Sequence, residues 1–342
     1  MSGPTWLRST RPPLFGDLHN WALIQADALA FLQVIPNDSV DAVITDPPYG
    51  IAFKGESWDG DLLADADGFQ AFSTTWAREV RRVLRPGGYL ASFGATKTTH
   101  RLVAGVEDAG LEIRDQLLWL YSTGVPKGRR MPGGVSSALR PAYEPILLAR
   151  KPLPRGRTLT RHVEETGLGA LDIDGTSANP PDRSWPTNVL LAHEERCAEA
   201  CGPRCTVRLI DEIAKSERRG ARPVSRLFYS TKATPTEREA GCEALPKITS
   251  EIFSSKTGGR ARANVHPTVK PLDLCRWITR LVAPPGGSLV LDPFTGSGSI
   301  GCAAVLEGRQ FIGIERDHRY VPIARARLTH WTRQAARSSE PR

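Results

Sequence analysis

A strand that runs into a glycine-rich loop and then into a helix constrains this fold more than any other feature. Ser288-Leu-Val-Leu291 has the length and apolar character of a buried strand, and residues 299–307 form a predicted helix. The loop between them contains Gly296 and Gly298, and glycines let a backbone turn tightly and approach a ligand closely. Strand–loop–helix units of this kind build parallel sheets, because the helix returns the chain to the start of the next strand.

Strands and helices alternate along much of the chain. The predicted strands are residues 21–24, 40–45, 89–93, 116–121, 145–149, 288–291 and 310–314. The predicted helices are residues 28–34, 69–84, 98–109, 272–282, 299–307 and 320–335. This alternation predicts an α/β fold with three layers, in which a mostly parallel sheet is covered by helices on both faces.

Residues 151–263 interrupt the alternation. They are rich in Pro, Gly, Arg and Ser, and they contain only short apolar pieces such as residues 188–192. A stretch of this length is too long for a simple connection, so we expect an inserted module or a functional loop region. The predicted division is an N-terminal extension (1–17), a first half of the core (18–150), the inserted region (151–263), a second half of the core (264–335) and a tail (336–342).

The glycine loop predicts a nucleoside-binding site. Gly296, Gly298 and Gly301 have the spacing G-x-G-x-x-G, which alone is a weak indication of a dinucleotide site. Asp292 ends the preceding strand, where its carboxylate would repel a pyrophosphate but hold the ammonium group of a methionine moiety. Glu315 ends the following strand and is placed to accept hydrogen bonds from ribose hydroxyls. The chain lacks the Gly-Lys-Ser/Thr sequence of a nucleoside-triphosphate P-loop.

A second motif, Asp46-Pro-Pro-Tyr49, follows the predicted strand 40–45 directly. A carboxylate and a backbone carbonyl can each accept one N–H of a base amino group, which makes that nitrogen a better nucleophile. Pro47 and Pro48 hold the carbonyls rigidly, because proline has a fixed φ and no N–H. Tyr49 offers a ring on which an extruded base can stack. In isolation the tetrapeptide would equally suit an ordinary turn.

Together the two motifs resemble those of the amino-methylating DNA methyltransferases in their circularly permuted, β-class arrangement. In that family Asp-Pro-Pro-Tyr precedes the target-recognition region and the glycine loop comes last. The resemblance covers roughly residues 20–150 and 264–330. It implies a Rossmann-like methyltransferase fold, S-adenosylmethionine as the cofactor and double-stranded DNA as the substrate.

Further segments extend the resemblance. Residues 25–28 resemble the segment whose acid contacts the cofactor adenine, residues 266–271 the cofactor-flanking motif, and residues 49–59 the mobile loop beside the target base. The resemblance implies catalytic roles for Asp46, Pro47, Pro48 and Tyr49. It implies cofactor contacts for Asp27, Ala28, Asp46, His266, Thr268, Lys270, Asp292, Pro293, Phe294, Thr295, Gly296, Gly298, Glu315 and Arg316.

The resemblance favours adenine N6 over cytosine N4, because Asp at the first position of the tetrapeptide goes more often with adenine and Ser with cytosine. The pocket chemistry serves both amino groups. An RNA or protein methyltransferase is a nearer alternative than a nicotinamide-dependent oxidoreductase, which only the glycine spacing supports. A non-catalytic DNA-binding module would not need a cofactor loop. Methylation at cytosine C5 needs a thiolate, usually in a Pro-Cys pair, and no cysteine here follows a proline.

The charge of the chain fits a polyanionic partner. The net charge is +8, and residues 122–157 hold eight Lys or Arg against one acid. This basic cluster predicts either a phosphate-binding surface or a solvated basic face. No run is long enough to span a membrane and no apolar signal core opens the chain, so a cytoplasmic, nucleoid-associated protein is expected. A homodimer and a cognate restriction endonuclease are compatible with the family.

A group of soft ligands lies in the inserted region. His193, Cys197, Cys201 and Cys205 follow one another at four-residue intervals and could hold a structural zinc ion. On a continuous helix this spacing would place all four side chains on one face, which suits a tetrahedral site poorly. Gly202-Pro203 would break such a helix, and Cys242 is an alternative ligand. Three unrelated thiols and a surface histidine are the competing interpretation.

Overall fold

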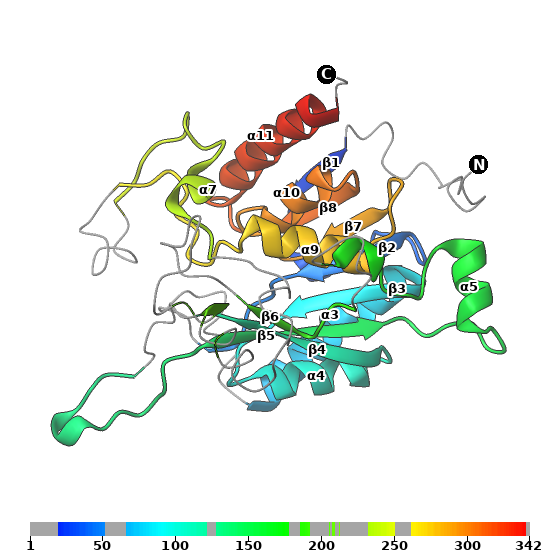
Figure 1. Cartoon of the computed structure of the whole chain (residues 1–342), viewed down its shortest axis with the longest axis horizontal. Coiled ribbons are helices and arrows are strands. Elements are labelled where there is room, and N and C mark those ends of the chain that lie inside the picture. Colours follow the sequence, from blue (N-terminus) through cyan, green and yellow to red (C-terminus); the bar gives the residue numbers. More distant parts are fainter. Residues whose placement is uncertain are drawn as a thin grey trace.

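The protein folds around one eight-stranded sheet, seen in the computed structural model (Figure 1). The structure describes residues 20–51, 66–121, 128–177, 185–191, 232–249 and 261–339, with positions 205, 207, 208 and 212. The strand order is β1-β8-β7-β2-β3-β5-β4-β6. The strands are β1 (Trp21–Gln25), β2 (Val40–Thr45), β3 (Leu84–Phe93), β4 (Glu112–Leu120), β5 (Tyr143–Arg150), β6 (Val189–Leu191), β7 (Leu289–Asp292) and β8 (Gln310–Glu315).

Every neighbouring pair is parallel except the two pairs that β5 makes with β3 and β4. The carboxyl ends of the parallel strands β2, β7 and β8 therefore meet at one edge of the sheet. In open α/β sheets this edge is where ligands bind.

Helices cover both faces of the sheet, which confirms the predicted three layers (Figure 1). Along β2, Ala42 and Ile44 face one layer while Val43 faces the other, as alternation along a strand requires. The helices are α1 (Ala28–Leu32), α3 (Ala66–Val83) and α4 (Thr99–Asp108) on one face, α9 (Leu272–Val282), α10 (Ser299–Leu306) and α11 (Val321–Ser339) on the other, and α5 (Leu159–Thr166) and α7 (Pro235–Glu239) in the interrupting region.

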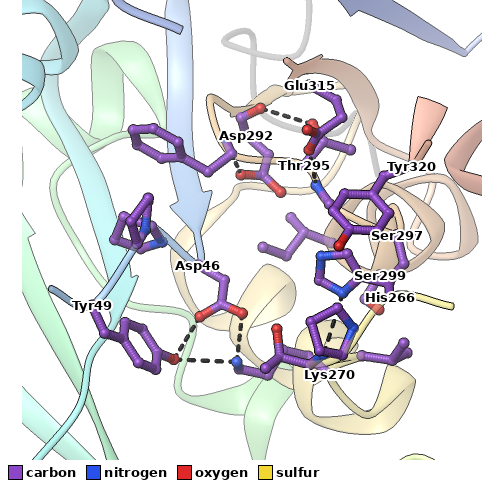
Figure 2. A pocket seen from close by; sticks show the side chains of 18 of the residues that line it. Asp46, Tyr49, His266, Lys270, Asp292, Thr295, Ser297, Ser299, Glu315 and Tyr320 are labelled. Carbon is purple, nitrogen blue, oxygen red and sulfur yellow. Dashed lines mark hydrogen bonds and ion pairs between the residues drawn. The ribbon is translucent and has the colours of Figure 1, made fainter. Parts of the chain in front are cut away.

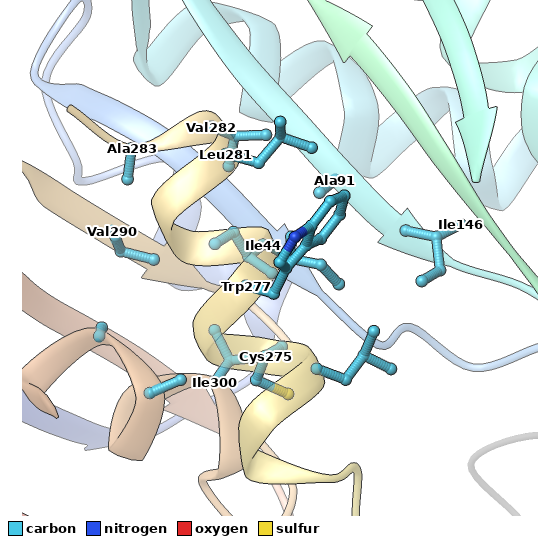
Figure 3. Packing of buried hydrophobic residues seen from close by; sticks show 14 of the residues in the cluster. Ile44, Ala91, Ile146, Cys275, Trp277, Leu281, Val282, Ala283, Val290 and Ile300 are labelled. Carbon is cyan, nitrogen blue, oxygen red and sulfur yellow. The ribbon is translucent and has the colours of Figure 1, made fainter. Parts of the chain in front are cut away.

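Helix α9 packs its apolar face on the middle of the sheet. Trp277 is 2% exposed and lies among side chains from β2, β3 and β7 (Figure 3). Its indole nitrogen donates to the backbone oxygen of Thr176, 3.1 Å away, so residues 174–176 are tied to the core. The helix that directly follows the candidate cofactor-flanking segment 266–271 is thereby fixed relative to the strands that lead into the other motifs.

The predicted strands and helices of the core are all present, with some changed ends. α3 ends at Val83, but strand pairing begins at Leu84 and not at Tyr89; a bulge opposite Val40 and Ala42 accommodates residues 85–88. The last helix reaches Ser339, into the predicted tail and four residues beyond the predicted helix end at 335. None of the described helices has the length and apolar character that crossing a membrane requires.

Residues 151–263 contribute more to the core than their composition suggested. β6 lies parallel to β4 and extends the sheet, as expected for residues 188–192. α5 was not predicted; Thr158 caps its first turn, Gly167 ends it in the left-handed conformation, and His162 buries its ring against Pro86. The division into a core and an inserted recognition module stays a prediction.

Candidate active site

Three carboxylates lie at the carboxyl ends of three adjacent strands. Asp46 follows β2, Asp292 ends β7 and Glu315 ends β8, so the sheet order brings them into one cavity of about 1020 Å³ (Figure 2). The residues predicted for catalysis and for cofactor contacts all line this cavity except Gly298. It is large enough for a nucleoside cofactor together with a second group.

Asp46 is held by two donors. The Tyr49 hydroxyl donates to its Oδ1 at 2.6 Å, and the Lys270 ammonium donates to its Oδ2 at 2.5 Å (Figure 2). Thr98 donates to the Tyr49 backbone oxygen at 2.7 Å, which fixes the end of the tetrapeptide. Lys270, for which the resemblance implies a cofactor contact, has its ammonium on the Asp46 carboxylate, and the cofactor contact stays a prediction.

Burial changes the pKa values of Asp46, Tyr49 and Lys270. Burial raises the pKa of Asp46, and Lys270 opposes that rise. Burial lowers the pKa of Lys270, but the Asp46 and Glu144 carboxylates outweigh it, so the net shift is upward and the ammonium stays charged. The pKa of Tyr49 is raised well above its ordinary value by burial and by Asp46, so the phenol stays protonated and donates.

Asp292 is 1% exposed, and only one of its two carboxylate oxygens accepts hydrogen bonds from the described residues. Its Oδ1 accepts from the Thr45 hydroxyl at 2.7 Å and from the Phe294 amide at 3.1 Å. Its Oδ2 is buried and accepts no hydrogen bond from the described residues. Burial raises the pKa of Asp292 to about 8. A buried acceptor without a donor costs free energy, and a cationic group in the cavity would satisfy it.

The glycine loop is closed by Glu315. This carboxylate accepts from the amides of Gly296 and Asp317, each at 2.7 Å, and its oxygens still have lone pairs that face the cavity. Gly296 has φ +54°, and a Cβ there would lie 2.6 Å from the His266 ring. Gly301 instead serves packing, since a Cβ would lie 2.4 Å from Phe311. Gly298 caps α10 with φ +78°.

Residues 266–270 line the cavity between the glycine loop and the Asp46-Pro-Pro-Tyr49 motif, with His266 beside Gly296 and Lys270 on Asp46. Burial lowers the pKa of His266 to about 3, with the cations Arg238 and Lys270 acting in the same direction, so the ring is neutral. The ring packs edge-on against that of Tyr320, with 4.5 Å between the ring centroids, and its Nδ1 accepts a hydrogen bond from the Thr268 amide. His266 is therefore an uncharged wall of the cavity.

The remaining predicted cofactor residues line the opposite wall and the rim. Asp27 lines the cavity and also caps α1, since its Oδ1 accepts from the Ala30 amide at 3.1 Å. Phe294 contacts Trp76 edge-on, with 6.0 Å between the rings, and forms an apolar wall. The other members of this group are Ala28, Pro293, Thr295 and Arg316.

Sequence reasoning missed one wall of the cavity. β4 and β5 contribute Trp119, Tyr121, Tyr143 and Glu144, which belong to no local motif. Burial raises the pKa of Tyr121 beyond its usual range, and the Glu144 carboxylate adds to the effect. The aromatic residues were visible as Tyr and Trp at strand ends, but their convergence depends on the antiparallel placement of β5.

Three of the four proposed zinc ligands, His193, Cys197 and Cys201, lie outside the described residues, and the fourth, Cys205, lies within them. Cys205 is buried and packs with Leu191. Cys242, the alternative ligand, lies in a different cluster of buried residues beside Ala263. Among the described residues no group of metal-ligating side chains is close enough to hold an ion.

The basic cluster of residues 122–157 divides into two parts. Arg150 and Lys151 form ion pairs with acids of the core, and Arg157 pairs with Glu165 of α5, so these three are structural. Arg155 is exposed between β5 and α5. Arg129, Arg130 and Arg140 are exposed on an arm, residues 128–142, that projects from the body between β4 and β5 (Figure 1). Lys127 lies outside the described residues.

Comparisons with known proteins agree with this geometry. The sequence pattern of a family described as DNA methylase matches residues 40–326. The chain is 26% identical over 322 residues to DNA adenine methyltransferase YhdJ of Escherichia coli K12, covering 90% of this chain and 82% of that protein. It is 23% identical over 319 residues to type II methyltransferase M.HinfI of Haemophilus influenzae, covering 90% and 67%. The fold resembles that of PvuII DNA methyltransferase (cytosine-N4-specific), with a TM-score of 0.55, 15% identity and 93% of each chain covered.

Proposed function

The chain belongs to the DNA methylase family, and on that premise we propose that it transfers a methyl group from S-adenosylmethionine to adenine N6 in double-stranded DNA. The observation that carries the proposal is the placement of Asp46 and Asp292 at the ends of neighbouring parallel strands in one cavity. One carboxylate suits a base amino group, and the other suits the ammonium of the cofactor.

The cavity fits the cofactor. Bound S-adenosylmethionine supplies an electrophilic methyl group on a sulfonium centre. Asp292 Oδ2, buried and without a donor among the described residues, accepts the ammonium. Glu315 would accept from ribose hydroxyls with its remaining lone pairs, and Phe294 offers an apolar wall to the nucleoside.

Asp46 acts on the target base. It accepts one N–H of the amino group, and a carbonyl of the Pro47-Pro48 segment accepts the other, which shifts the nitrogen toward a tetrahedral, nucleophilic state. The base must leave the duplex stack to reach this position. Tyr49, Trp119, Tyr121 and Tyr143 line the cavity and offer aromatic faces for the extruded base.

Adenine is preferred because Asp46 opens the tetrapeptide and the E. coli relative is named an adenine methyltransferase. Cytosine N4 is the second candidate, because the amino group presents the same two N–H donors and PvuII methyltransferase shares the fold. The choice depends on the shape of the aromatic wall against a purine or a pyrimidine.

DNA is held by the arm of residues 128–142. Its three exposed arginines face no acid within the arm, and its two ends lead to Tyr121 and Tyr143 at the cavity. Arginines placed in this way bind phosphates and hold the duplex with a base at the cavity mouth. A second copy of the chain, a cognate restriction endonuclease and a location at the nucleoid stay predictions.

The test is expression in a host that lacks DNA methylation, followed by sequencing of the host DNA for modified bases. We expect N6-methyladenine at a defined short sequence with the wild-type protein. Asp46→Ala should leave no modified base, while Asp108→Asn, an exposed acid on α4 remote from the cavity, should match wild type. DNA without any modified base in the wild-type culture would contradict the proposal.

A further inference from the structure

A second carboxylate lies beside the Asp46–Lys270 pair. Glu144 on β5 places its Oε2 3.5 Å from the Lys270 ammonium. This oxygen is buried and accepts no hydrogen bond from the described residues. Its other oxygen, Oε1, lies 3.5 Å from the Tyr121 hydroxyl. Lys270 therefore has one carboxylate at contact distance and a second within reach.

The pair in its present form obstructs the proposed reaction. Tyr49 and Lys270 each donate to one oxygen of Asp46, at 2.6 and 2.5 Å. An ammonium this close withdraws electron density from the carboxylate and fills the space beside Oδ2. The amino group of a base needs that space and needs Asp46 as a strong acceptor.

Moving Lys270 into an uncharged part of the cavity would be costly, because a buried charge must keep a partner. Glu144 removes this cost. A shift of about 0.7 Å would bring the ammonium from 3.5 Å to the usual charge-assisted distance from Glu144. The same shift lengthens the 2.5 Å contact with Asp46 Oδ2 to at most about 3.2 Å, so the ammonium must swing further around the Glu144 carboxylate to clear that oxygen. The rings of Phe93 and Tyr49, whose centroids lie 4.9 and 5.5 Å from Nζ, remain beside the ammonium on this path.

We propose that Glu144 is a positioning residue that takes the ammonium of Lys270 when the target amino group occupies Asp46. The inference rests on the proposed function, since it concerns the same reaction. In the free enzyme Lys270 keeps Asp46 ionised. When the base enters, the ammonium moves to Glu144, and Asp46 Oδ2 accepts the N–H. No bond of the protein forms or breaks in this step.

The test is a double-mutant cycle on Glu144 and Lys270. Methyl transfer is measured in a single turnover, with enzyme in excess over a duplex oligonucleotide that carries the sequence methylated by the wild-type enzyme in the host. Glu144→Gln should slow transfer at least tenfold, while the KM for DNA and the affinity for S-adenosylmethionine change less than about twofold. In a Lys270→Gln background the same substitution should change the rate less than about twofold.

The matched control is Glu107→Gln, an exposed glutamate on α4 outside the cavity, which should match wild type. An equal loss in both backgrounds would show that Glu144 contacts the base itself, and no loss in either would show that it does nothing; both outcomes overturn the inference. If Lys270→Gln does not fold, Glu144→Asp provides the second measurement. It keeps the charge at a greater distance, so its rate should lie between those of wild type and Glu144→Gln, and a rate no higher than that of Glu144→Gln would contradict the inference.

Failure of the proposed function is recognised separately. It would appear as a wild-type enzyme that transfers no methyl group to DNA. Failure of this inference would appear as an active wild-type enzyme in which the two Glu144→Gln effects do not depend on Lys270.

Discussion

Binding of the cofactor should depend on pH through Asp292. The pKa of this carboxyl is about 8 in the ligand-free protein, because the side chain is buried. At neutral pH most molecules therefore carry it protonated. An ammonium group binds the ionised form, so a proton must leave when the cofactor enters, and affinity must rise as pH rises toward 8.

The size of the effect follows from the fraction that is ionised. With a pKa of about 8, the apparent affinity for S-adenosylmethionine at pH 7 should be about 11-fold below the affinity of the fully ionised form. At pH 6 it should be about 100-fold below that affinity. The change is nearly tenfold per pH unit, or about 1.4 kcal/mol.

Titration calorimetry with S-adenosylmethionine between about pH 6 and pH 7.5, in two buffers with different ionisation heats, measures both quantities. Close to one proton should be released per cofactor bound at neutral pH. Asp292→Asn should bind more weakly and with no such dependence, and Asp108→Asn should behave as wild type. An affinity independent of pH in the wild-type protein, with no proton released, would refute the assignment of Asp292 to the ammonium.

The same substitution has an opposite effect on stability. The carboxyl has a pKa of 3.8 when unfolded and about 8 when folded, so the unfolded chain releases its proton first as pH rises. The free energy of unfolding therefore falls from about pH 4 to pH 8 through this group. Asp292→Asn removes that loss, and the ligand-free variant should melt at a higher temperature than wild type at pH 8.

Four further predictions concern other parts of the molecule. Asp46→Ala should abolish methyl transfer but leave the calorimetric affinity for S-adenosylmethionine within a few-fold of wild type; near-normal turnover would remove Asp46 from the mechanism. Replacing Arg129, Arg130 and Arg140 by Ala should reduce the slope of log K against log salt by about 2.7. Replacing three exposed arginines of α5 and α11 outside the cavity (Arg161, Arg325 and Arg333) should leave the slope unchanged, and equal slopes for both triple variants would make the segment 128–142 a solvated surface. Nucleoside analysis of methylated DNA should give N6-methyladenine, and N4-methylcytosine alone would reverse the choice of base. Metal analysis of protein purified without chelator decides the zinc hypothesis: a site predicts one zinc per chain that Cys201→Ser releases, and zinc far below that ratio contradicts it.

The local motifs could be predicted from the sequence because each depends on neighbouring residues. The strand 40–45 was predicted with its observed ends, since it is a short, mostly apolar and β-branched run that two prolines follow at 47 and 48. The helix 272–282 was equally clear, because its apolar residues recur at helical spacing. The order of the strands places both motifs in one cavity, as the parallel pattern required.

The pairing of Lys270 with Asp46 could not be predicted in this way. The two residues are 224 positions apart, and nothing in either motif indicates that they meet. Glu144 was counted only as the one acid in a basic cluster, and its position beside Lys270 depends on β5 lying antiparallel between β3 and β4. Arg150 and Lys151 were counted in the same cluster, although their partners Glu112 and Asp38 come from other strands and loops.

Asp46 and Asp292 differ in how the negative charge of a carboxylate in this cavity is compensated. Each is a carboxyl buried at the end of a central strand, where an unpaired negative charge would be costly. The carboxylate of Asp46 is compensated by the ammonium of Lys270, whereas Asp292 is mostly protonated at pH 7 in the ligand-free protein. A cationic cofactor therefore meets a site whose negative charge is created on binding, at the cost of one proton. An incoming base instead meets a carboxylate that is covered by an ammonium, and it reaches that carboxylate when Lys270 moves from Asp46 to Glu144.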